Sequence, residues 1–353
     1  MKPQIVKQCV GADMSKDNFA VNFRVRKDND DTPIKGRTTF KNTLKGFKSF
    51  VEWINKKRKE GVEVWIVVEA TGVYHEELVY YLHEHTDFLI SVQLANKVKH
   101  FAASHNVKTK TDAEDAAVIS QMGVERKLDI WKPISKQMQT LRQLTRHKNS
   151  LQAGKTRITN QLHALHHSHA PHKKVVSNLK QQVSQLEKQI KGVTKLIEDT
   201  IALDSDLAQK IERVCTIKGL GTATVATIVA ETGGFVLFNS RRQLISYAGY
   251  DVVQKESGSS VRGKTHISKK GNAHIRGALF MPAMIAAIHN EKLREVHERV
   301  YERTKIYKKA NVAVQRKLLV LIYTLFTKNE EYDANYEENK AAAKAAVENK
   351  QPA

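Results

Sequence analysis

The chain has 353 residues, which is enough for two or three domains with substantial hydrophobic cores. Lysine and arginine together number 58 and aspartate and glutamate 37, so the formal net charge is +21. Such an excess of cations favours a polyanionic partner, and nucleic acid above all, because cations that meet phosphates release condensed counterions. An acidic membrane surface would require a basic amphipathic helix with an aromatic face, and no good candidate for one is present.

The remaining composition argues against a secreted or membrane protein. Cys9 and Cys215 lie far apart without CxxC spacing, which disfavours a disulfide framework or a zinc finger. The first four residues lead directly into a strand-like segment and do not resemble a signal peptide. The most apolar stretch, residues 278–288, contains Pro282 and falls short of the roughly 20 residues that span a bilayer. We therefore expect a soluble, cytoplasmic protein without a membrane partner.

The first third of the chain alternates between strand and helix patterns. Residues 5–13 form an apolar run that ends in Asp13, and residues 62–68 form a β-branched run that ends at Glu69. We expect strands at 5–13, 18–25, 37–40, 62–68 and 88–92, and helices at 44–54, 73–85 and 112–122. Three strands followed by alternating helices and strands indicate an α/β domain of the ribonuclease-H-like type.

The middle of the chain is helical. Residues 135–203 contain one proline and two glycines, and their apolar positions step by four and three, as in the a and d positions of a coiled coil, at Leu179, Val183, Leu186, Ile190 and Val193. A helix of this kind can join two subunits or simply bridge two domains. We predict that this one joins subunits.

The last part of the chain indicates a compact helical domain. Gly219 and Gly221 punctuate a turn before residues 222–231, a pattern typical of a helix-hairpin-helix whose backbone N–H groups can hold a phosphate. A polar, glycine-rich loop is expected at 254–272, followed by apolar helices at 275–289 and 312–326. The tail, residues 329–353, has few apolar groups and is expected to be solvated helix or disorder.

Four carboxylates stand out by position. Asp13 and Glu69 end two strands, and Asp112 and Asp115 lie three apart, so on a helix they share one face. Acids at strand ends beside such a helix can converge on Mg²⁺ or Mn²⁺, because hard cations prefer oxygen ligands. Two ions there could stabilise the attacking and leaving oxygens of a phosphoryl transfer. Each acid taken alone is better explained as a surface group or a helix cap, as for Asp112 after Thr111, and only the four together favour a metal site.

A second group of residues surrounds Ser257. The run from Glu256 to Gly263 is followed by Lys264, His266, Lys269 and Lys270. Glycines at 258 and 263 allow close approach to a ligand, cations can hold phosphates, and a serine activated by a base or a metal can attack phosphorus. The same composition is also typical of a flexible linker.

A histidine cluster and several basic runs give weaker indications of function. Five histidines between 163 and 172 have metal-like spacing, but no acid or cysteine joins them and Pro171 would bend the helix, so a solvated face is favoured. Basic runs recur in all three regions of the chain. Their recurrence favours a long polyanion that follows the surface.

At this point the motifs resemble a known family, the DEDD transposases of the insertion-sequence-110 family, whose members are understood as RNA-guided serine recombinases. The resemblance covers the chain to about Lys328 and rests on these segments: Val10 to Asp13, Val68 to Tyr74, Lys110 to Ala116, Ile217 to Thr222, Ala248-Gly249, Glu256 to Gly263 and Arg276 to Met284. Together these segments are highly specific, although each alone is weak.

The resemblance implies roles for particular residues. Asp13, Glu69, Asp112 and Asp115 match the four acidic metal ligands, and Ser257, the first serine of its run, matches the nucleophile. Nucleic-acid contacts are expected at Lys110, Gly219, Gly221, Arg262, Lys264, Lys269, Lys270 and Arg276. The implied plan is a RuvC-like catalytic domain at 1–132, a coiled-coil region at 133–205, a C-terminal transposase domain with the serine at 206–328, and the low-complexity tail.

The resemblance also implies partners. A structured guide RNA, the bridge RNA of the element, would pair with double-stranded target and donor DNA. The acids and the serine would come from different subunits of a homo-oligomer, a dimer that assembles into a tetramer.

Three other functions compete with a recombinase. A RuvC-like junction resolvase or nuclease would use the acids without the serine and would hydrolyse DNA. An actin-like ATP-binding protein would need a second phosphate loop and an adenosine motif, and neither is found. A catalytically idle nucleic-acid scaffold fits poorly with five intact candidate positions.

Overall fold

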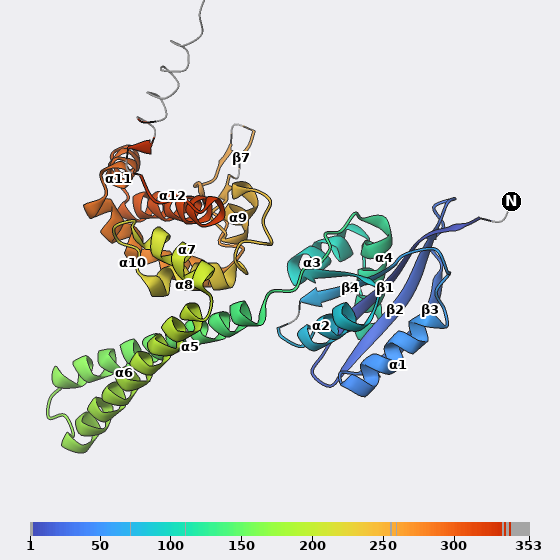
Figure 1. Cartoon of the computed structure of the whole chain (residues 1–353), viewed down its shortest axis with the longest axis horizontal. Helices are drawn as coiled ribbons and strands as arrows, with labels where there is room; N and C mark the ends of the chain where they lie inside the picture. The colour runs from blue at the N-terminus through green and yellow to red at the C-terminus, as the bar shows by residue number, and fades with distance from the viewer. Residues whose placement is uncertain are drawn as a thin grey trace, which may run out of the picture. The chain divides into compact units, whose positions relative to one another are not determined.

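The computed structural model describes residues 3–70, 72–109, 111–254, 256–258, 260–333, 335–336 and 339, with the side chains at 261 and 262 excepted. The chain divides into two compact units, Met1–Pro133 and Ile134–Ala353. Figure 1 shows a sheet with helices in the first unit and helices with one ribbon of short strands in the second.

The first unit is built on a five-stranded sheet in the order β3-β2-β1-β4-β5. The strands are β1 (Ile5–Met14), β2 (Asn18–Lys27), β3 (Ile34–Lys41), β4 (Val64–Ala70) and β5 (Leu89–Leu94). β1, β2 and β3 are antiparallel neighbours, whereas β4 runs parallel to both β1 and β5. This mixed sheet fits the α/β domain predicted for this part of the chain.

Helices cover both faces of the sheet. They are α1 (Leu44–Asn55), α2 (Glu76–His85), α3 (Ala95–Ser104) and α4 (Asp112–Glu125). Apolar residues of α1 and α2 pack with Phe19 and Phe23 in one core cluster. Those of α3 and α4 pack with Cys9 and Val67 in another. The central strands alternate side chains between these two layers, which is why nearly all their positions are apolar.

The second unit begins with two long helices, α5 (Lys136–His166) and α6 (Lys173–Ala202), which form an antiparallel hairpin (Figure 1). Gln137 Nε2 donates to the Thr200 carbonyl at 2.9 Å, and Lys155 Nζ lies 2.7 Å from a Glu187 carboxylate oxygen. The less exposed positions of α6 follow the predicted stripe, and Leu186 of that stripe approaches Gly154 of α5. The stripe therefore has a partner within its own chain, and its use in joining subunits stays a prediction.

The rest of the second unit is mostly helical. Its helices are α7 (Ser205–Cys215), α8 (Thr222–Glu231), α9 (Arg241–Tyr247), α10 (Ala273–His289), α11 (Glu291–Thr304) and α12 (Tyr307–Lys328). Leu141 of α5 and Ile197 of α6 share one buried cluster with these helices, so the inner end of the hairpin belongs to the same core. The predicted division into a coiled-coil region and a C-terminal domain stays a prediction.

One expectation about this unit was wrong, and two of its helices were not anticipated. The loop expected at 254–272 includes short ladders, because β6 (Val252–Val253) pairs with β9 (His266–Ile267) and β7 (Glu256–Ser257) pairs with β8 (Val261–Arg262). Two-residue strands are too short to show periodicity. The helices α9 and α11 were not expected either, since one is short and the other is mainly polar.

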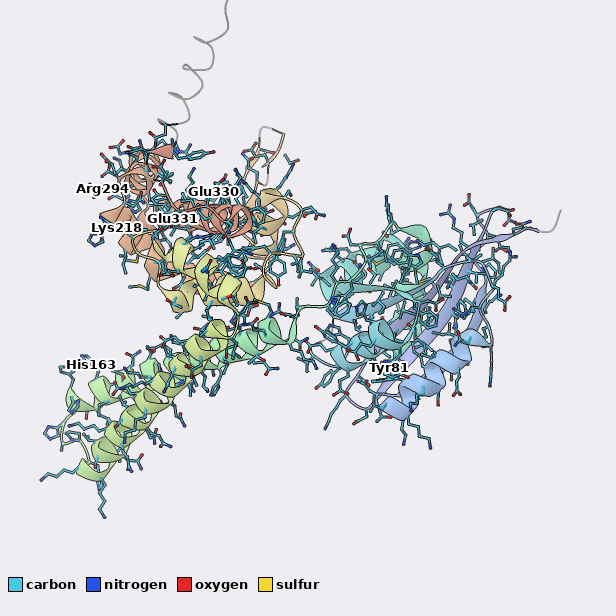
Figure 2. The ribbon with its side chains drawn as sticks, viewed as in Figure 1. Tyr81, His163, Lys218, Arg294, Glu330 and Glu331 are labelled. Atoms are coloured by element: carbon cyan, nitrogen blue, oxygen red, sulfur yellow. The ribbon has the colours of Figure 1, made fainter. Side chains whose placement is uncertain are left out.

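The histidine cluster lies at the outer end of the hairpin, where Figure 2 shows His163. His163 and His167 approach with 3.2 Å between their Nε2 atoms. Among the described residues no group of histidine, cysteine or acid side chains is arranged to hold a metal. Within the same residues, no helix combines the length and hydrophobicity needed to cross a membrane.

Candidate active site

The two strand-end acids lie on neighbouring parallel strands. In the register of β1 and β4, Gly11 faces Val67 and Ala12 faces Val68, so Asp13 and Glu69 follow at the same edge of the sheet. Parallel strands present their carboxyl ends at one edge, which is where α/β sheets gather functional groups. Both carboxylates also share a sheet face with Gly11 and Val67, the face covered by α4.

Two glycines let α4 lie directly on the sheet. A Cβ at Gly11 would come within 2.3 Å of the Ser120 backbone nitrogen, and one at Gly123 within 2.1 Å of Cys9 Sγ. The Ser120 hydroxyl donates to Asn22 Oδ1 at 2.9 Å and so ties the middle of α4 to β2. Cys9 of β1 lies against Gly123 near the end of α4, whereas Gly11, two residues later in β1, lies against Ser120, which is nearer the start of that helix. The next inward position of β1, Asp13, therefore lies beside the first turn of that helix.

The other two acids stand in that first turn. Thr111 is the N-cap of α4, and its hydroxyl accepts the Glu114 backbone N–H at 3.3 Å. This cap starts the helix at Asp112, so that Asp112 and Asp115 lie near its positive end, which favours carboxylates. Asp112 is exposed and Asp115 is half-buried. The cap that could explain Asp112 alone thus also positions both acids beside Asp13.

The electrostatics show that the acids are neighbours. Burial raises the pKa of the Asp13 carboxyl to about 6, and the charges of Asp115, Asp112 and Glu69 add to the effect in that order. A backbone hydrogen bond at Met14 opposes the rise in pKa only partly. Like charges at short range disfavour ionisation, so this shift reports crowding of carboxylates at one edge.

The donor set suits a hard divalent cation. All four candidate ligands are carboxylates, and the charge repulsion that raises the pKa of Asp13 is the kind that a bound cation relieves. In the part of the chain that the structure describes, these side chains do not form a closed group of metal ligands. The four acids are therefore gathered by the fold, and their convergence on a metal stays a prediction.

Ser257 lies in the last strand position before a tight turn. It pairs with Val261 across the β7–β8 ladder, and Gly258, the next residue, has φ +56°. Glycine adopts this left-handed backbone without steric cost. Ser257 and Gly258 are exposed, as is Lys264, which follows the return strand β8. The ribbon therefore presents the serine to solvent at its tip, next to backbone that a ligand can approach closely.

Buried polar groups hold the base of this ribbon. The Glu231 side chain is 0 % exposed and accepts hydrogen bonds from Arg146 at 2.6 and 2.8 Å and from Asn272 Nδ2 at 2.6 Å. Burial opposes ionisation of Glu231, but hydrogen bonds from Arg146 and Asn272 outweigh it, so its pKa is lowered. Asn272 is also the N-cap of α10. Glu231 thereby links α5 to the segment that returns from the ribbon.

The predicted nucleic-acid contacts fall into different environments. Lys264, Lys269 and Lys270 are exposed on or after the ribbon, as a phosphate contact requires. Arg276 instead donates to the Ala248 carbonyl at 2.7 Å and to the Asn272 carbonyl at 3.3 Å, so its guanidinium serves the base of the ribbon. Lys110 and the Arg262 side chain lie outside the described residues.

Of the two glycines in the predicted phosphate-binding turn, only Gly219 is packed closely against another helix. Gly219 has φ +100°, and a Cβ there would lie 2.9 Å from the Ala286 backbone nitrogen of α10. Gly221 is the N-cap of α8 without a side-chain cap, and a Cβ there would meet nothing within 4 Å. The turn thus leaves the start of α8 open near Gly221, while a helix-hairpin-helix that binds phosphate stays a prediction.

The sequence did not predict a role for two polar residues, Gln93 and Glu231, that lie near the candidate sites. Gln93 of β5 is the register partner of Glu69 and is only 5 % exposed. Its signal was a polar residue within an apolar strand. Glu231 ends an apolar helix, and nothing local distinguishes it from a surface acid.

Comparison with known proteins identifies the family. Residues 10–171 match a model of the DEDD transposases of the IS110 type, and residues 211–298 match the transposase IS116/IS110/IS902 family. The pilin gene-inverting proteins of Moraxella bovis and Moraxella lacunata are each 27 % identical over 94 % of this chain and 99 % of their own. An insertion element IS110 protein of Streptomyces coelicolor is 23 % identical over 40 % of this chain and 36 % of its own.

Solved structures resemble the chain only weakly. Thermus thermophilus RuvC aligns with a TM-score of 0.23 and 12 % identity, over 36 % of this chain and 83 % of its own. The same protein with a Holliday junction aligns with a TM-score of 0.24, over 36 % of this chain and 84 % of its own. The two family models together span both compact units, from the strand that carries Asp13 to the helix after the Ser257 ribbon. The chain belongs to the IS110 family of transposases.

Proposed function

We propose that this transposase cleaves and rejoins DNA strands through a covalent phosphoserine intermediate formed on Ser257. The observation that carries the proposal is the gathering of four carboxylates at one sheet edge, where burial first and then the charges of the other three acids raise the pKa of Asp13 to about 6. Crowded like charges reduce the stability of a fold, and such local conflicts are typical of functional sites. The second unit of the same chain carries an exposed serine on a ribbon of its own.

The four acids would hold Mg²⁺ or Mn²⁺. A divalent cation bound to Asp13, Glu69, Asp112 and Asp115 would stabilise the charge that develops on the scissile phosphate and the departing oxygen. The chain itself contributes the placement of these ligands. Parallel β1 and β4 align Asp13 with Glu69, and the Thr111 cap orients the first turn of α4.

Ser257 would be the nucleophile. As its Oγ bonds to phosphorus, the bond from phosphorus to the departing strand breaks, the serine proton passes to water, and the departing oxygen takes up a proton. Attack by a DNA hydroxyl on the phosphoserine reverses these steps and restores the serine. Rejoining needs no ATP, because the phosphoserine retains the energy of the broken phosphodiester. Lys264, Lys269 and Lys270 are exposed nearby in sequence and can contact phosphates.

The proposed partners are double-stranded target and donor DNA together with a structured bridge RNA from the element. The net charge of +21 supports polyanionic partners. The matched relatives are described as inverting a pilin gene, and inversion requires strands to be broken and rejoined. We further propose that a dimer assembles into a tetramer in which the acids and the serine of one site come from different subunits.

The decisive experiment asks whether DNA becomes linked to Ser257. Ser257→Ala should eliminate a protein–DNA adduct on denaturing gels and should abolish strand exchange. Ser260→Ala is the matched control, because Ser260 is an exposed hydroxyl on the same turn and should retain the adduct. Strand exchange by Ser257→Ala would refute the serine mechanism.

A junction resolvase that hydrolyses DNA is the second candidate. It is favoured by the fact that all four acids belong to the first compact unit, so hydrolysis by water requires nothing from the ribbon. In that case Ser257→Ala would still cut a four-way junction at the wild-type rate, and no adduct would form with either protein.

A further inference from the structure

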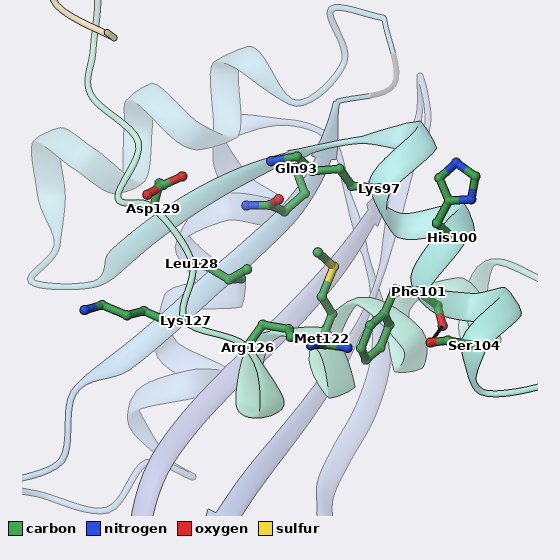
Figure 3. Close-up of a pocket in the computed structure, with 10 residues that line it drawn as sticks. All are labelled: Gln93, Lys97, His100, Phe101, Ser104, Met122, Arg126, Lys127, Leu128 and Asp129. Carbon is green, nitrogen blue, oxygen red and sulfur yellow. Dashed lines mark hydrogen bonds between the residues drawn. The ribbon is translucent and has the colours of Figure 1, made fainter. Parts of the chain in front are cut away.

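A second feature of the first unit is a cavity of about 480 Å³ on the sheet face covered by α3 and α4 (Figure 3). Its walls come from the end of β5, from α3, and from the end of α4 with the segment after it. A volume of this size is typical of small-molecule sites. No step of the proposed cleavage uses these residues.

The floor of the cavity is apolar. Phe101, which is 6 % exposed, and Met122, which is 7 % exposed, line it together with the half-buried Leu128. An aromatic ring and a thioether are good contacts for another flat ring, since both favour stacked or edge contacts with π systems. The floor therefore suits a planar, aromatic ligand group.

A polar group with a defined orientation lies over this floor. Gln93 Nε2 donates to Ser91 Oγ at 2.8 Å, and that hydroxyl donates to the Asp129 carbonyl at 2.7 Å. This chain of hydrogen bonds uses one N–H of the Gln93 amide, so its other N–H and its carbonyl oxygen can face a ligand. In Figure 3 the amide extends over the cavity between Asp129 and Met122. A fixed amide that offers a donor and an acceptor is suited to the edge of a nucleobase.

The rim is cationic. Lys97, Arg126 and Lys127 contribute three permanent positive charges against one carboxylate, that of Asp129, and all four residues are exposed. Lys97 stands in the first turn of α3, whose N-cap, Leu94, makes no side-chain cap hydrogen bond. A helix start of this kind adds partial positive charge to the rim. The rim therefore suits a phosphate and opposes a free cation.

The cavity adjoins the candidate active site. Gln93 and Glu69 are register partners on parallel strands, so their side chains leave the sheet on the same face. A ligand held by Gln93 would lie next to the acid edge. We propose that this cavity binds one unpaired nucleotide of a polynucleotide, with the base on the Phe101 floor and a phosphate at the Lys97 and Arg126 rim.

This inference rests on the proposed function for the nature of the ligand, because a strand cleaved at the acid edge must pass beside Gln93. Proteins that work on a single nucleotide hold its base by stacking and by hydrogen bonds to its edge. The nucleotide can belong to a DNA strand or to RNA, and both offer the same base and phosphate. The two sources must be separated by experiment.

The test is photo-crosslinking of the full-length protein with two trinucleotides that carry a central 5-iodouracil, one with deoxyribose and one with ribose. In EDTA, at least one of them should form an adduct on the tryptic peptide from His100 to Lys108, which contains Phe101. The probe that reacts more strongly identifies the source. Absence of an adduct on this peptide with both probes would overturn the proposal.

Variants make the test specific. Leu128→Trp should fill the cavity and reduce the adduct at least fivefold. The double variant Lys97→Glu with Arg126→Glu should do so by reversing two charges of the rim, one of which lies over the Phe101 ring at 5.7 Å. Lys45→Glu with Lys48→Glu is the matched control, because these exposed lysines lie on α1, across the sheet, and should leave the adduct unchanged. Equal yields from the rim variant and this control would also overturn the proposal.

The result is separable from that of the proposed function. Asp13→Asn should lose strand cleavage but keep the adduct, since crosslinking requires no chemistry at the acids. An adduct together with undiminished cleavage by Asp13→Asn would reject the acid site and leave the nucleotide pocket standing. If Asp13→Asn loses cleavage but the wild type forms no adduct, the acid site is supported and the nucleotide pocket is rejected.

Discussion

Asp13 is the residue on which stability and function make opposite demands. Its half-buried carboxyl has a pKa of about 6, raised first by burial and then by the three other acids. A carboxyl whose pKa is higher in the folded state destabilises that state as pH rises from its unfolded value through 6. At neutral pH without metal, the ionised Asp13 therefore lowers the free energy of unfolding.

We predict that Asp13→Asn stabilises the metal-free protein and abolishes cleavage. The two-unit shift in pKa corresponds to about 3 kcal/mol, which solvent screening of a half-exposed group reduces to about 1–2 kcal/mol. Urea unfolding of the first unit in EDTA at pH 7.5 should show this increase, and gel shift should show nearly unchanged nucleic-acid binding. Undiminished cleavage by both Asp13→Asn and Asp115→Asn in Mg²⁺ would contradict the metal site.

Glu231 shows the opposite case, an acid that the fold stabilises in its charged form. Its pKa is lowered because hydrogen bonds from Arg146 and Asn272 outweigh burial. An acid with a lowered folded pKa contributes stability above its unfolded pKa, near 4.5, and this contribution is lost as pH falls below that value.

We predict that Glu231→Gln lowers the free energy of unfolding at pH 7 by about 2–3 kcal/mol, less than for a fully buried pair because Arg146 is 46 % exposed. The difference from wild type should stay constant from pH 7 to about 5 and shrink below the unfolded pKa. Denaturant titrations at several pH values measure it. A difference that grows toward low pH would show that Glu231 is not held ionised in the folded state.

At the scale of elements, the candidate site depends on how closely α4 approaches β1. Gly11 permits that contact, since any Cβ there would collide with backbone of α4 rather than with a flexible side chain. The same contact places the first turn of α4, with Asp112 and Asp115, beside the end of β1. A displaced α4 would separate these acids from Asp13 even if the helix itself stayed intact.

We predict that Gly11→Ala lowers the free energy of unfolding by about 1–3 kcal/mol, as overpacking does, and reduces cleavage much more than loss of folded protein explains. Gly192→Ala is the control, because Gly192 is an exposed position of α6 with nothing within 4 Å of a Cβ. That variant should be neutral or more stable by up to about 1 kcal/mol. Thermal unfolding measures the stability of both variants, and a cleavage assay measures their activity. Wild-type cleavage by Gly11→Ala would show that close contact of α4 with Gly11 is not needed to position the acids.

At the scale of the whole molecule, the role of the long hairpin in joining subunits is a prediction that the packing of α6 refines. The partly buried stripe of α6 faces α5 of the same chain, so an association of subunits through the hairpin would use other positions. Leu196 of α6 is 52 % exposed and lies outside the stripe that faces α5. It is therefore a cleaner probe of association than Leu186, whose replacement would disturb the hairpin itself.

We predict that Leu196→Lys lowers the oligomer mass measured by light scattering, without lowering the helix content measured by circular dichroism. Ser184→Lys, an exposed position on a different face of α6, adds the same charge and should leave the mass unchanged. If both variants keep the wild-type mass, the exposed face at Leu196 does not join subunits.

Much of the first unit could be predicted from sequence because its signals are local. Alternating or continuous apolar runs specified the five strands, and Thr111 before Asp112 specified the start of α4. The family motifs predicted the acids and the serine because residue type and spacing can be recognised from the sequence alone, without knowing which residues are in contact. The ribbon that bears Ser257 was missed, since strands of two residues have no period to detect.

The sequence by itself determined the excess of positive charge and most elements of the first unit, and it supplied the prediction of the acids and the serine, since each of these depends on neighbouring residues. Only the tertiary structure decided which distant groups meet. The burial and the carboxylate crowding that raise the pKa of Asp13 depend on the register of β1 with β4 and on α4 packing at Gly11. The α5 partner of α6, the Glu231 linkage and the cavity beside Gln93 likewise join residues far apart in the chain, because packing and hydrogen bonding act across space rather than along the sequence.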